Sequence, residues 1–314
     1  MNDSTYDLII IGGGPAGIAG GVYAARKRLS TILLAEEIGG QSAVSEGIEN
    51  WIGTIKIAGI DFAKALRAHL AAYQQDVVTI CEHERVTTLT HTDNVFTATT
   101  ASGASYRARA VFIAAGAARR KLDVPGAKKF ENKGVTYCAS CDGPLFSDMD
   151  VVVVGGGNAG FETAAQLLAY TKSVTLIHRH KEFKADPVTV EQLLKHPHMH
   201  TMVSTEPVEV KGDVFVTGLT VRNKETGETS ELPVSGVFVE AGLLPNTDFA
   251  KELLALDPTK RIVTNPKNQR TSVEGVWAAG DCTDELYHQN NIAAGDAVKA
   301  IEDLYHWLAT HKTT

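Results

Sequence analysis

The chain has 314 residues, of which 44% are hydrophobic and 21% are charged, and these values indicate a globular protein of about two domains. Its formal net charge of −7 argues against a nucleic-acid partner, because such binding requires a basic surface. The N-terminal sequence lacks the features of a signal peptide, and the apolar run at residues 8–11 is far too short to span a bilayer, so we expect a cytoplasmic protein with no membrane partner.

One internal repeat organises the sequence as strand, glycine turn, helix and strand. An apolar run at residues 8–11 precedes the glycine cluster 12–17, and the same order returns at residues 151–154 and 155–160. The predicted helices that follow lie at 18–27 and 161–170, and the second strands lie at 31–34 and 174–177. This succession is the βαβ unit of a dinucleotide-binding fold, so the chain contains two such units.

Other segments complete the two units. Residues 71–109 alternate between apolar and polar and predict short strands and hairpins. Residues 111–116 and 237–242 each read as a late core strand that ends in Ala-Gly. Residues 275–281 form a further strand and turn, which has no βαβ unit of its own.

The order of these segments predicts the domain organisation. The unpaired strand and turn belong most simply to the first domain, which makes the second domain an insertion. The chain then returns to the first domain near residue 247 and ends with a helix over residues 297–308. The sequence predicts an α/β fold with two Rossmann-like dinucleotide-binding domains, formed by residues 1–117 with 247–314 and by residues 118–246.

The first glycine cluster has the features of a pyrophosphate site. Gly12 permits a tight turn, Gly14 lets the backbone approach a pyrophosphate, and Gly17 lets the helix pack closely on the strand. The helix N-terminus supplies free N–H groups to the phosphates. Glu36 follows about 20 residues later, where an acid accepts hydrogen bonds from ribose hydroxyls. The alternative is a glycine turn that binds nothing.

The second cluster bears on the choice of nucleotide. Arg179 stands where the first copy has Glu36. A base there suits the 2′-phosphate of NADPH, because a guanidinium binds phosphate through paired hydrogen bonds, whereas an acid suits the free hydroxyl of NADH. His178, His180 and Lys184 lie nearby in the sequence. We therefore favour NADPH, and the alternative is a solvated basic strand end.

Cys138 and Cys141 form a CxxC motif and are the candidate reactive centre. A lone CxxC in a reducing cytosol is more often redox-active than structural. The spacing lets a helical turn bring the two sulfurs together, and a helix N-terminus lowers the pKa of a thiol. Asp142 follows directly and is a candidate proton shuttle. Zinc is disfavoured because no second ligand pair accompanies the motif.

Weaker expectations concern other cysteines and histidines. Cys81 is expected to be a small buried side chain that follows a strand, and no role is inferred for Cys282. His196, His198 and His200 alternate along the chain, and we expect them to face solvent. No metal site is predicted.

Together these motifs resemble those of the low-molecular-weight, bacterial-type thioredoxin reductases. They are also similar to the reductase portion of the alkyl hydroperoxide reductase flavoprotein subunit. The resemblance covers essentially the whole chain. It rests on residues 12–17, 39–41, 48–51, 114–117, 138–143, 155–160 with Glu162, and 275–281.

The resemblance implies a cofactor for each domain. FAD would be held in the first domain by Gly12, Gly14, Pro15, Ala16, Gly17, Glu36, Gln41, Asn50, Ala115, Gly116, Gly280, Asp281 and Gln289. NADPH, or alternatively NADH, would be held in the second domain by Gly155, Gly157, Asn158, Gly160, His178, Arg179, His180 and Lys184. Gln289 opens the last helix, whose N-terminus would stabilise negative charge on the reduced flavin. His288 either approaches the flavin or acts as a capping residue.

The resemblance also implies how the cysteines work. Cys141 would face the flavin, Cys138 would attack the disulfide of a thioredoxin-like dithiol protein, and Asp142 would act as acid and base. The family works as a homodimer. Its second domain rotates about hinges that would fall near residues 117–120 and 244–247 here.

Departures from the family pattern leave alternatives open. His180 and Lys184 stand where the family's NADPH signature has arginines, and the peroxide-linked relatives have an acid in this region and prefer NADH. Some relatives take electrons from ferredoxin, although the intact glycine cluster and Glu162 argue against that here. A glutaredoxin-like or peroxide-detoxifying partner is a further alternative, as is a non-catalytic flavin redox sensor. A partner module of the peroxide-linked type is expected to be a separate protein.

Overall fold

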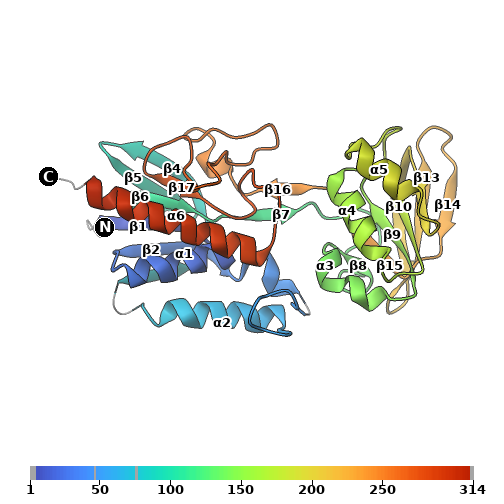
Figure 1. Cartoon of the computed structure of the whole chain (residues 1–314), viewed down its shortest axis with the longest axis horizontal. Helices are drawn as coiled ribbons and strands as arrows, with labels where there is room; N and C mark the ends of the chain where they lie inside the picture. The colour runs from blue at the N-terminus through green and yellow to red at the C-terminus, as the bar shows by residue number, and fades with distance from the viewer. Residues whose placement is uncertain (1–4, 46, 75–76, 312–314) are drawn as a thin grey trace. The chain divides into compact units, whose positions relative to one another are not determined.

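The computed structural model describes residues 5–45, 47–74 and 77–311 (Figure 1). Its residues cluster into two compact units. Unit 1 comprises residues 1–118 and 244–314, and unit 2 comprises residues 119–243. Each unit contains a mainly parallel sheet with helices, and unit 2 is inserted into the chain of unit 1. The predicted α/β fold with two Rossmann-like units is therefore confirmed.

Unit 1 is built on a sheet with the strand order β3-β2-β1-β6-β5-β4, and β17 also pairs with β6. The strands are β1 (Tyr6–Gly13), β2 (Thr31–Ile38), β3 (Val78–Glu82), β4 (Val86–Thr92), β5 (Val95–Thr100), β6 (Ser105–Ile113) and β17 (Val276–Ala278). The pairs β1–β2, β1–β6, β2–β3 and β6–β17 are parallel, whereas β4 and β5 form an antiparallel hairpin that continues from β6.

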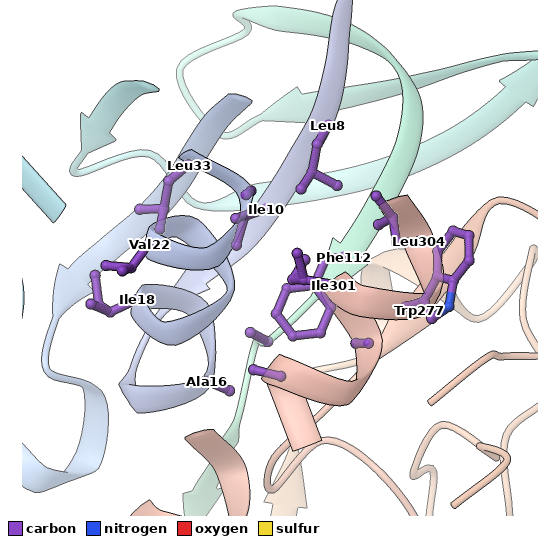
Figure 2. Close-up of a cluster of buried hydrophobic side chains, with 14 of the residues drawn as sticks. Leu8, Ile10, Ala16, Ile18, Val22, Leu33, Phe112, Trp277, Ile301 and Leu304 are labelled. Carbon is purple, nitrogen blue, oxygen red and sulfur yellow. The ribbon is translucent and has the colours of Figure 1, made fainter. Parts of the chain in front are cut away.

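Both faces of this sheet are covered, which explains the uninterrupted apolar runs in its central strands. On one face, Leu8, Ile10, Leu33 and Phe112 from the sheet pack against α1 and α6, as Figure 2 shows. On the other face, Ile9 and its neighbours pack under the segments that follow unit 2 in the chain. The helices are α1 (Pro15–Arg26), α2 (Gly59–Ala71) and α6 (Asn290–Thr310), with 3-10 turns η1 (Gly40–Val44) and η3 (Asp248–Ala250).

Unit 2 repeats the plan on a smaller scale, with the parallel strand order β11-β10-β9-β15-β8. The strands are β8 (Val135–Thr136), β9 (Asp150–Val154), β10 (Ser173–Ile177), β11 (Met199–Met202) and β15 (Gly236–Val239). The helices are α3 (Ala139–Asp142), α4 (Asn158–Leu167) and α5 (Pro187–Leu194), with a 3-10 turn η2 (Gly143–Phe146). A second, antiparallel sheet contains β12 (Thr205–Gly212), β13 (Val216–Asn223) and β14 (Thr229–Leu232). It packs on the face of the parallel sheet that carries Val152 and Val237.

The two chain segments that connect the units pair with each other. They are β7 (Ala117–Arg119) and β16 (Leu243–Pro245), and they form a two-stranded sheet. Among the described residues, no helix is both long and apolar enough to cross a membrane.

The helix bounds differ from those that the sequence predicts. The helix predicted at 18–27 begins at Pro15, because proline fits the first turn of a helix, where its missing N–H costs nothing. The helix predicted at 161–170 begins at Asn158, directly after the glycine turn. The final helix is longer than the predicted 297–308, since its polar first turn carries no apolar period to reveal it.

Candidate active site

The first glycine turn connects β1 to α1 and contains two glycines that the fold itself requires. Gly12 has a φ of +115°, and a Cβ atom there would lie 2.1 Å from the carbonyl oxygen of Ala114. A Cβ atom on Gly17 would lie 1.9 Å from the carbonyl oxygen of Gly12. Gly14, the N-cap of α1, differs because an added Cβ would meet no described atom within 4 Å. Space is therefore open for a ligand to approach the backbone at Gly14.

A cavity of about 400 Å³ lies beside this turn within unit 1. Its volume falls in the range of small-molecule and cofactor sites, roughly 300–1,000 Å³. It lies at the carboxyl ends of β1, β2 and β6, which is where ligands bind in open α/β sheets. Most residues predicted to hold FAD line it: Gly12, Gly14, Pro15, Ala16, Glu36, Gln41, Ala115, Gly116, Gly280 and Asp281.

Three polar residues of the cavity wall were missed by reasoning from motifs. They are Ser42, Asn246 and Asn290. Ser42 Oγ donates to Asn290 Oδ1 at 2.8 Å, and Asn246 Nδ2 donates to the carbonyl oxygen of Ala115 at 2.9 Å. Asn290 is the first residue of α6, and a helix N-terminus beside a glycine turn is a signal that the sequence does offer. Asn246 gives no such signal, because its place depends on where the chain re-enters unit 1.

Asn50 and Gln289 lie together at the start of α6. Asn50 Nδ2 donates to Gln289 Oε1 at 3.1 Å, and Asn291 Nδ2 donates to the carbonyl oxygen of Asn50 at 2.7 Å. His288 Nδ1 lies 3.4 Å from Oδ1 of Asp281, so this histidine sits beside a residue of the cavity wall. Within the described part of the chain the wall itself includes neither Asn50 nor Gln289. Their contact with a flavin stays a prediction.

The second glycine turn connects β9 to α4 and repeats the first in detail. Gly155 has a φ of +139°, and a Cβ atom there would lie 2.3 Å from the carbonyl oxygen of Glu240. A Cβ atom on Gly160 would lie 1.9 Å from the carbonyl oxygen of Gly155. Gly157 is the N-cap of α4, and an added Cβ would again meet no described atom within 4 Å. Unit 2 therefore presents a second helix N-terminus that is open to a ligand.

Glu240 is a largely buried acid beside this second turn. Its Oε1 accepts a hydrogen bond from Thr163 Oγ1 at 2.8 Å, which attaches the carboxyl to α4. Burial raises the pKa of the Glu240 carboxyl, and the hydrogen bond from Thr163 opposes that rise. The motifs gave no sign of Glu240, although it stands where the corresponding strand end of unit 1 has an alanine.

The four basic residues predicted to hold a phosphate fall into two groups. Arg179, His180 and Lys184 are exposed, as phosphate ligands must be before binding. His178 is only 7% exposed, and its Nδ1 accepts a hydrogen bond from the N–H of Gly156 at 3.2 Å. Burial and the nearby His180 lower the pKa of His178, so at neutral pH its ring is uncharged and supports the glycine turn.

The segment that contains these residues is attached to the glycine turn at two further points. The N–H of Lys184 donates to the carbonyl oxygen of Gly156 at 2.8 Å. The N–H of Asp186 donates to Oδ1 of Asn158 at 2.8 Å. The structure therefore brings the basic segment and the open helix N-terminus of unit 2 together, as the sequence spacing suggested.

Cys138 and Cys141 form a disulfide in unit 2, with 5.3 Å between their Cα atoms. Cys138 is the N-cap of α3, and its carbonyl oxygen accepts from the N–H groups of Cys141 at 3.2 Å and Asp142 at 3.0 Å. Both cysteines are partly exposed. The predicted pairing by a single helical turn is confirmed. The disulfide is both accessible to a partner and placed at a helix N-terminus, where a thiolate is favoured.

Residues 6–298 match the protein family described as pyridine nucleotide-disulphide oxidoreductase. The chain belongs to this family. It is therefore an oxidoreductase, and the family's chemistry implies a flavin and a pyridine nucleotide as its cofactors. Two open glycine turns and one accessible disulfide are the parts that such chemistry needs.

Solved structures of thioredoxin reductases are similar to this family member over nearly the whole chain. The enzyme from Streptococcus pyogenes is 32% identical with a TM-score of 0.88, and it is covered completely by 98% of this chain. A thioredoxin reductase from Giardia duodenalis is 32% identical with a TM-score of 0.91 and the same coverage. The resemblance to bacterial-type thioredoxin reductases that the motifs indicated is thereby confirmed.

A curated relative has a different name. One alkyl hydroperoxide reductase protein, the flavoprotein component from Staphylococcus epidermidis, is 38% identical over 303 residues, which are 96% of this chain but 59% of the relative. This oxidoreductase therefore spans about three fifths of the length of that relative. The similarity agrees with the second resemblance inferred from the motifs.

The remaining cysteines of this family member are not part of the disulfide. Cys81 is half-buried on β3, so the expectation that it is buried was wrong. The reason is that β3 lies at the edge of its sheet, where one side has no neighbouring strand. Cys282 is fully buried, and burial raises the pKa of its thiol to about 12, which makes it unreactive.

The alternating histidines lie around β11. His198 and His200 are exposed and His196 is partly exposed. Within residues 5–45, 47–74 and 77–311, no group of three or more His, Cys, Asp or Glu side chains is arranged to hold a metal ion.

Proposed function

We propose that this chain is a thioredoxin-disulfide reductase that takes electron pairs from NADPH and passes them through FAD to the Cys138–Cys141 disulfide, and from there to a thioredoxin-like protein. The observation that carries the proposal is the accessible disulfide at a helix N-terminus, in a chain that also has two open nucleotide-type glycine turns. We further propose a homodimer that works in the cytoplasm, as the resemblance implies.

The residues around the cavity of unit 1 fit FAD. Gly14 leaves room for a pyrophosphate against the backbone, and the N–H groups at the start of α1 point to the same place. Glu36 lines the cavity with an exposed carboxylate, which suits ribose hydroxyls. When bound, FAD supplies a carrier that accepts an electron pair from a nicotinamide and donates it to a disulfide. We assign this role to residues 1–117 and 247–314.

The residues around the second turn fit a phosphorylated pyridine nucleotide. Gly157 and the start of α4 suit the pyrophosphate, and the exposed Arg179, His180 and Lys184 suit a 2′-phosphate. His178 supports the turn from beneath by accepting the N–H of Gly156. We assign NADPH binding to residues 118–246.

We expect Arg179→Ala to raise the KM for NADPH by about 10-fold, the change that corresponds to loss of one charge-assisted contact of about 1.4 kcal/mol. The KM for NADH should change by less than about 2-fold, because NADH has no 2′-phosphate for the guanidinium to bind. Steady-state kinetics with both donors measures this. Lys181→Ala is the matched control, since Lys181 is exposed in the same segment but pairs with Glu225 at 3.2 Å. Equal losses with NADPH and NADH would show that Arg179 does not hold the phosphate.

We expect the affinity of the protein for NADP⁺ to weaken as the pH falls, through loss of the hydrogen bond between Gly156 and His178. The folded protein holds the pKa of His178 below its ordinary value of about 6.5, so the ring is neutral at pH 7 and becomes protonated at lower pH. Protonation places a hydrogen on Nδ1 and removes the acceptor. Because the unfolded chain binds this proton more readily, the free energy of unfolding also decreases as the pH falls.

The variant His178→Asn retains an acceptor on a short side chain but does not titrate. Its affinity for NADP⁺, measured by calorimetry at several pH values, should fall less than that of the wild type between about pH 7 and pH 5. Comparing the two proteins cancels the titration of the nucleotide's own phosphate. His200→Asn, at an exposed histidine on β11, is the control. Identical pH profiles for the wild type and His178→Asn would contradict the assigned role of His178.

The cysteine pair itself performs the last part of the reaction by thiol–disulfide exchange. In the reduced protein, the Cys138 thiolate attacks one sulfur of the acceptor disulfide, and the other acceptor sulfur leaves as a thiolate. That thiolate takes up a proton, for which Asp142 is the candidate donor. The Cys141 thiolate then attacks the Cys138 sulfur, and the acceptor departs with two electrons as a dithiol. The chain returns to its disulfide form.

A second candidate acceptor is a peroxide-detoxifying thiol protein. The observations that favour it are the 38% identity with the alkyl hydroperoxide reductase relative and the presence of His180 and Lys184 where the thioredoxin reductase signature has arginines. On this alternative NADH serves as donor at least as well as NADPH.

The experiment that tests the proposed function pairs each donor with each acceptor. The protein loaded with FAD is assayed with NADPH or NADH and with an oxidised thioredoxin or an oxidised peroxiredoxin partner. The proposal expects the fastest turnover with NADPH and thioredoxin. Fastest turnover with NADH and the peroxiredoxin partner would favour the second candidate, and no turnover with any pair would contradict both.

A further inference from the structure

Thr136 connects the backbone of one redox cysteine to the carboxyl group of Asp142. Its Oγ1 donates a hydrogen bond to Oδ2 of Asp142 and accepts one from the N–H of Cys138 at 3.3 Å. Thr136 is only 3% exposed and ends β8, which pairs in register with β15. The hydroxyl is therefore held by the sheet, whereas Asp142 lies at the end of the one-turn helix α3.

The direction of these hydrogen bonds follows from the number of hydrogens available. A threonine hydroxyl has one hydrogen to donate, and the N–H of Cys138 can only donate. The Thr136 hydrogen must therefore point at Oδ2 of Asp142, which acts as an acceptor. A proton that Asp142 takes up or releases is accordingly placed on Oδ1, the oxygen that Thr136 does not engage.

We propose that Thr136 is a positioning residue for proton transfer at the cysteine pair. It fixes Oδ2 of Asp142 relative to the backbone of Cys138 and so leaves Oδ1 to deliver a proton to the departing thiolate of the acceptor. This inference rests on the proposed role of Cys138 and Asp142. Side chains that perform acid–base chemistry require such support, because small errors in position reduce the rate.

The balance of the exchange step shows where the effect must appear. The Cys138 thiolate forms a bond to one acceptor sulfur while the bond between the two acceptor sulfurs breaks, and the electron pair remains on the leaving sulfur. The proton moves from Oδ1 of Asp142 to that sulfur. A leaving thiolate of high pKa, as in an alkyl disulfide, depends on this proton, whereas an aryl thiolate of low pKa leaves without it.

The test compares Thr136→Val, which removes the hydroxyl but keeps a β-branched side chain, with Thr136→Ser, which keeps the hydroxyl. The full chain is reduced with dithiothreitol and freed of excess reagent. Its exchange rate is then measured with an alkyl disulfide, hydroxyethyl disulfide, and with an aryl disulfide, dithiobis(nitrobenzoate). This measurement requires no pyridine nucleotide or protein acceptor.

With hydroxyethyl disulfide we expect Thr136→Val to be about 10-fold slower than the wild type, and Thr136→Ser to be within about 2-fold of it, on the lower side of the range for general acid–base catalysis. With the aryl disulfide, both variants should react at the wild-type rate. In an Asp142→Asn background, Thr136→Val should cause no further loss with the alkyl disulfide, because the group that it positions is absent.

Two results would overturn the inference. One is equal slowing of Thr136→Val with both disulfides, which indicates a general structural defect. The other is an undiminished effect of Thr136→Val in the Asp142→Asn background. Failure of the wild type to accept electrons from NADPH or NADH would instead contradict the proposed function and would leave these exchange rates interpretable.

Discussion

Cys138→Ser is expected to abolish reduction of a dithiol acceptor while the bound flavin is still reduced by the pyridine nucleotide. A serine hydroxyl is neither a thiolate nucleophile nor able to form a disulfide, so turnover should fall by at least about 1,000-fold, the scale on which loss of a nucleophile acts. Acceptor-dependent oxidation of NADPH measures turnover, and the absorbance of the flavin measures its reduction. The control is Cys81→Ser, which changes a half-buried cysteine of unit 1. Normal turnover of Cys138→Ser would remove the assigned role.

Cys141→Ser separates the roles of the two sulfurs. It leaves the partly exposed Cys138 at the N-cap of α3, free to attack an acceptor disulfide. Without a second thiol to resolve it, the mixed disulfide between Cys138 and the acceptor should accumulate and be visible by mass spectrometry. If Cys138→Ser rather than Cys141→Ser traps the acceptor, the two roles must be exchanged.

The second large effect is expected from a pair of glycine substitutions in the first turn. Gly12→Ala places a Cβ atom 2.1 Å from the carbonyl oxygen of Ala114 at a φ of +115°, so it should destabilise unit 1 by about 3 kcal/mol or more through strain and a steric clash. Gly14→Ala places a Cβ atom in open space, so it should retain the stability of the apoprotein. It should nevertheless weaken FAD binding by at least about 10-fold, because the methyl group occupies the space needed by the pyrophosphate.

These two effects are separated by measuring thermal unfolding of the apoprotein and titrating it with FAD. Gly157→Ala is the matched control, because it makes the corresponding change in the turn of unit 2, where an added Cβ also meets no described atom within 4 Å. It should weaken NADP⁺ binding and leave FAD binding unchanged. If Gly14→Ala bound FAD as tightly as the wild type, the pyrophosphate would have to lie elsewhere.

The repeated glycine pattern carried most of the fold. Gly12 and Gly155 have positive φ angles, and Gly17 and Gly160 allow a helix to approach the preceding turn. Such backbone demands leave few other residues possible, so they are visible in a sequence. The helix starts were less visible. Polar first turns, such as that of α6, have no apolar period by which to recognise them.

Side-chain environments were the part that could be predicted least well. Next to Arg179 in the sequence, His178 reads as one more basic residue, yet its ring is buried against the glycine turn and accepts a backbone N–H. Thr136 and Asp142 meet only because a strand end and a one-turn helix are packed together. These facts depend on tertiary packing, which no local motif specifies.

The central claim is that reducing equivalents from a pyridine nucleotide reach one particular pair of sulfurs. The most direct measurement is an anaerobic one: NADPH is added to the FAD-loaded chain without any acceptor, new thiols are alkylated, and the labelled peptides are identified. We predict two new thiols per chain, at positions 138 and 141, and no new label at Cys81 or Cys282. A flavin that loses its colour while 138 and 141 stay oxidised would contradict the claim.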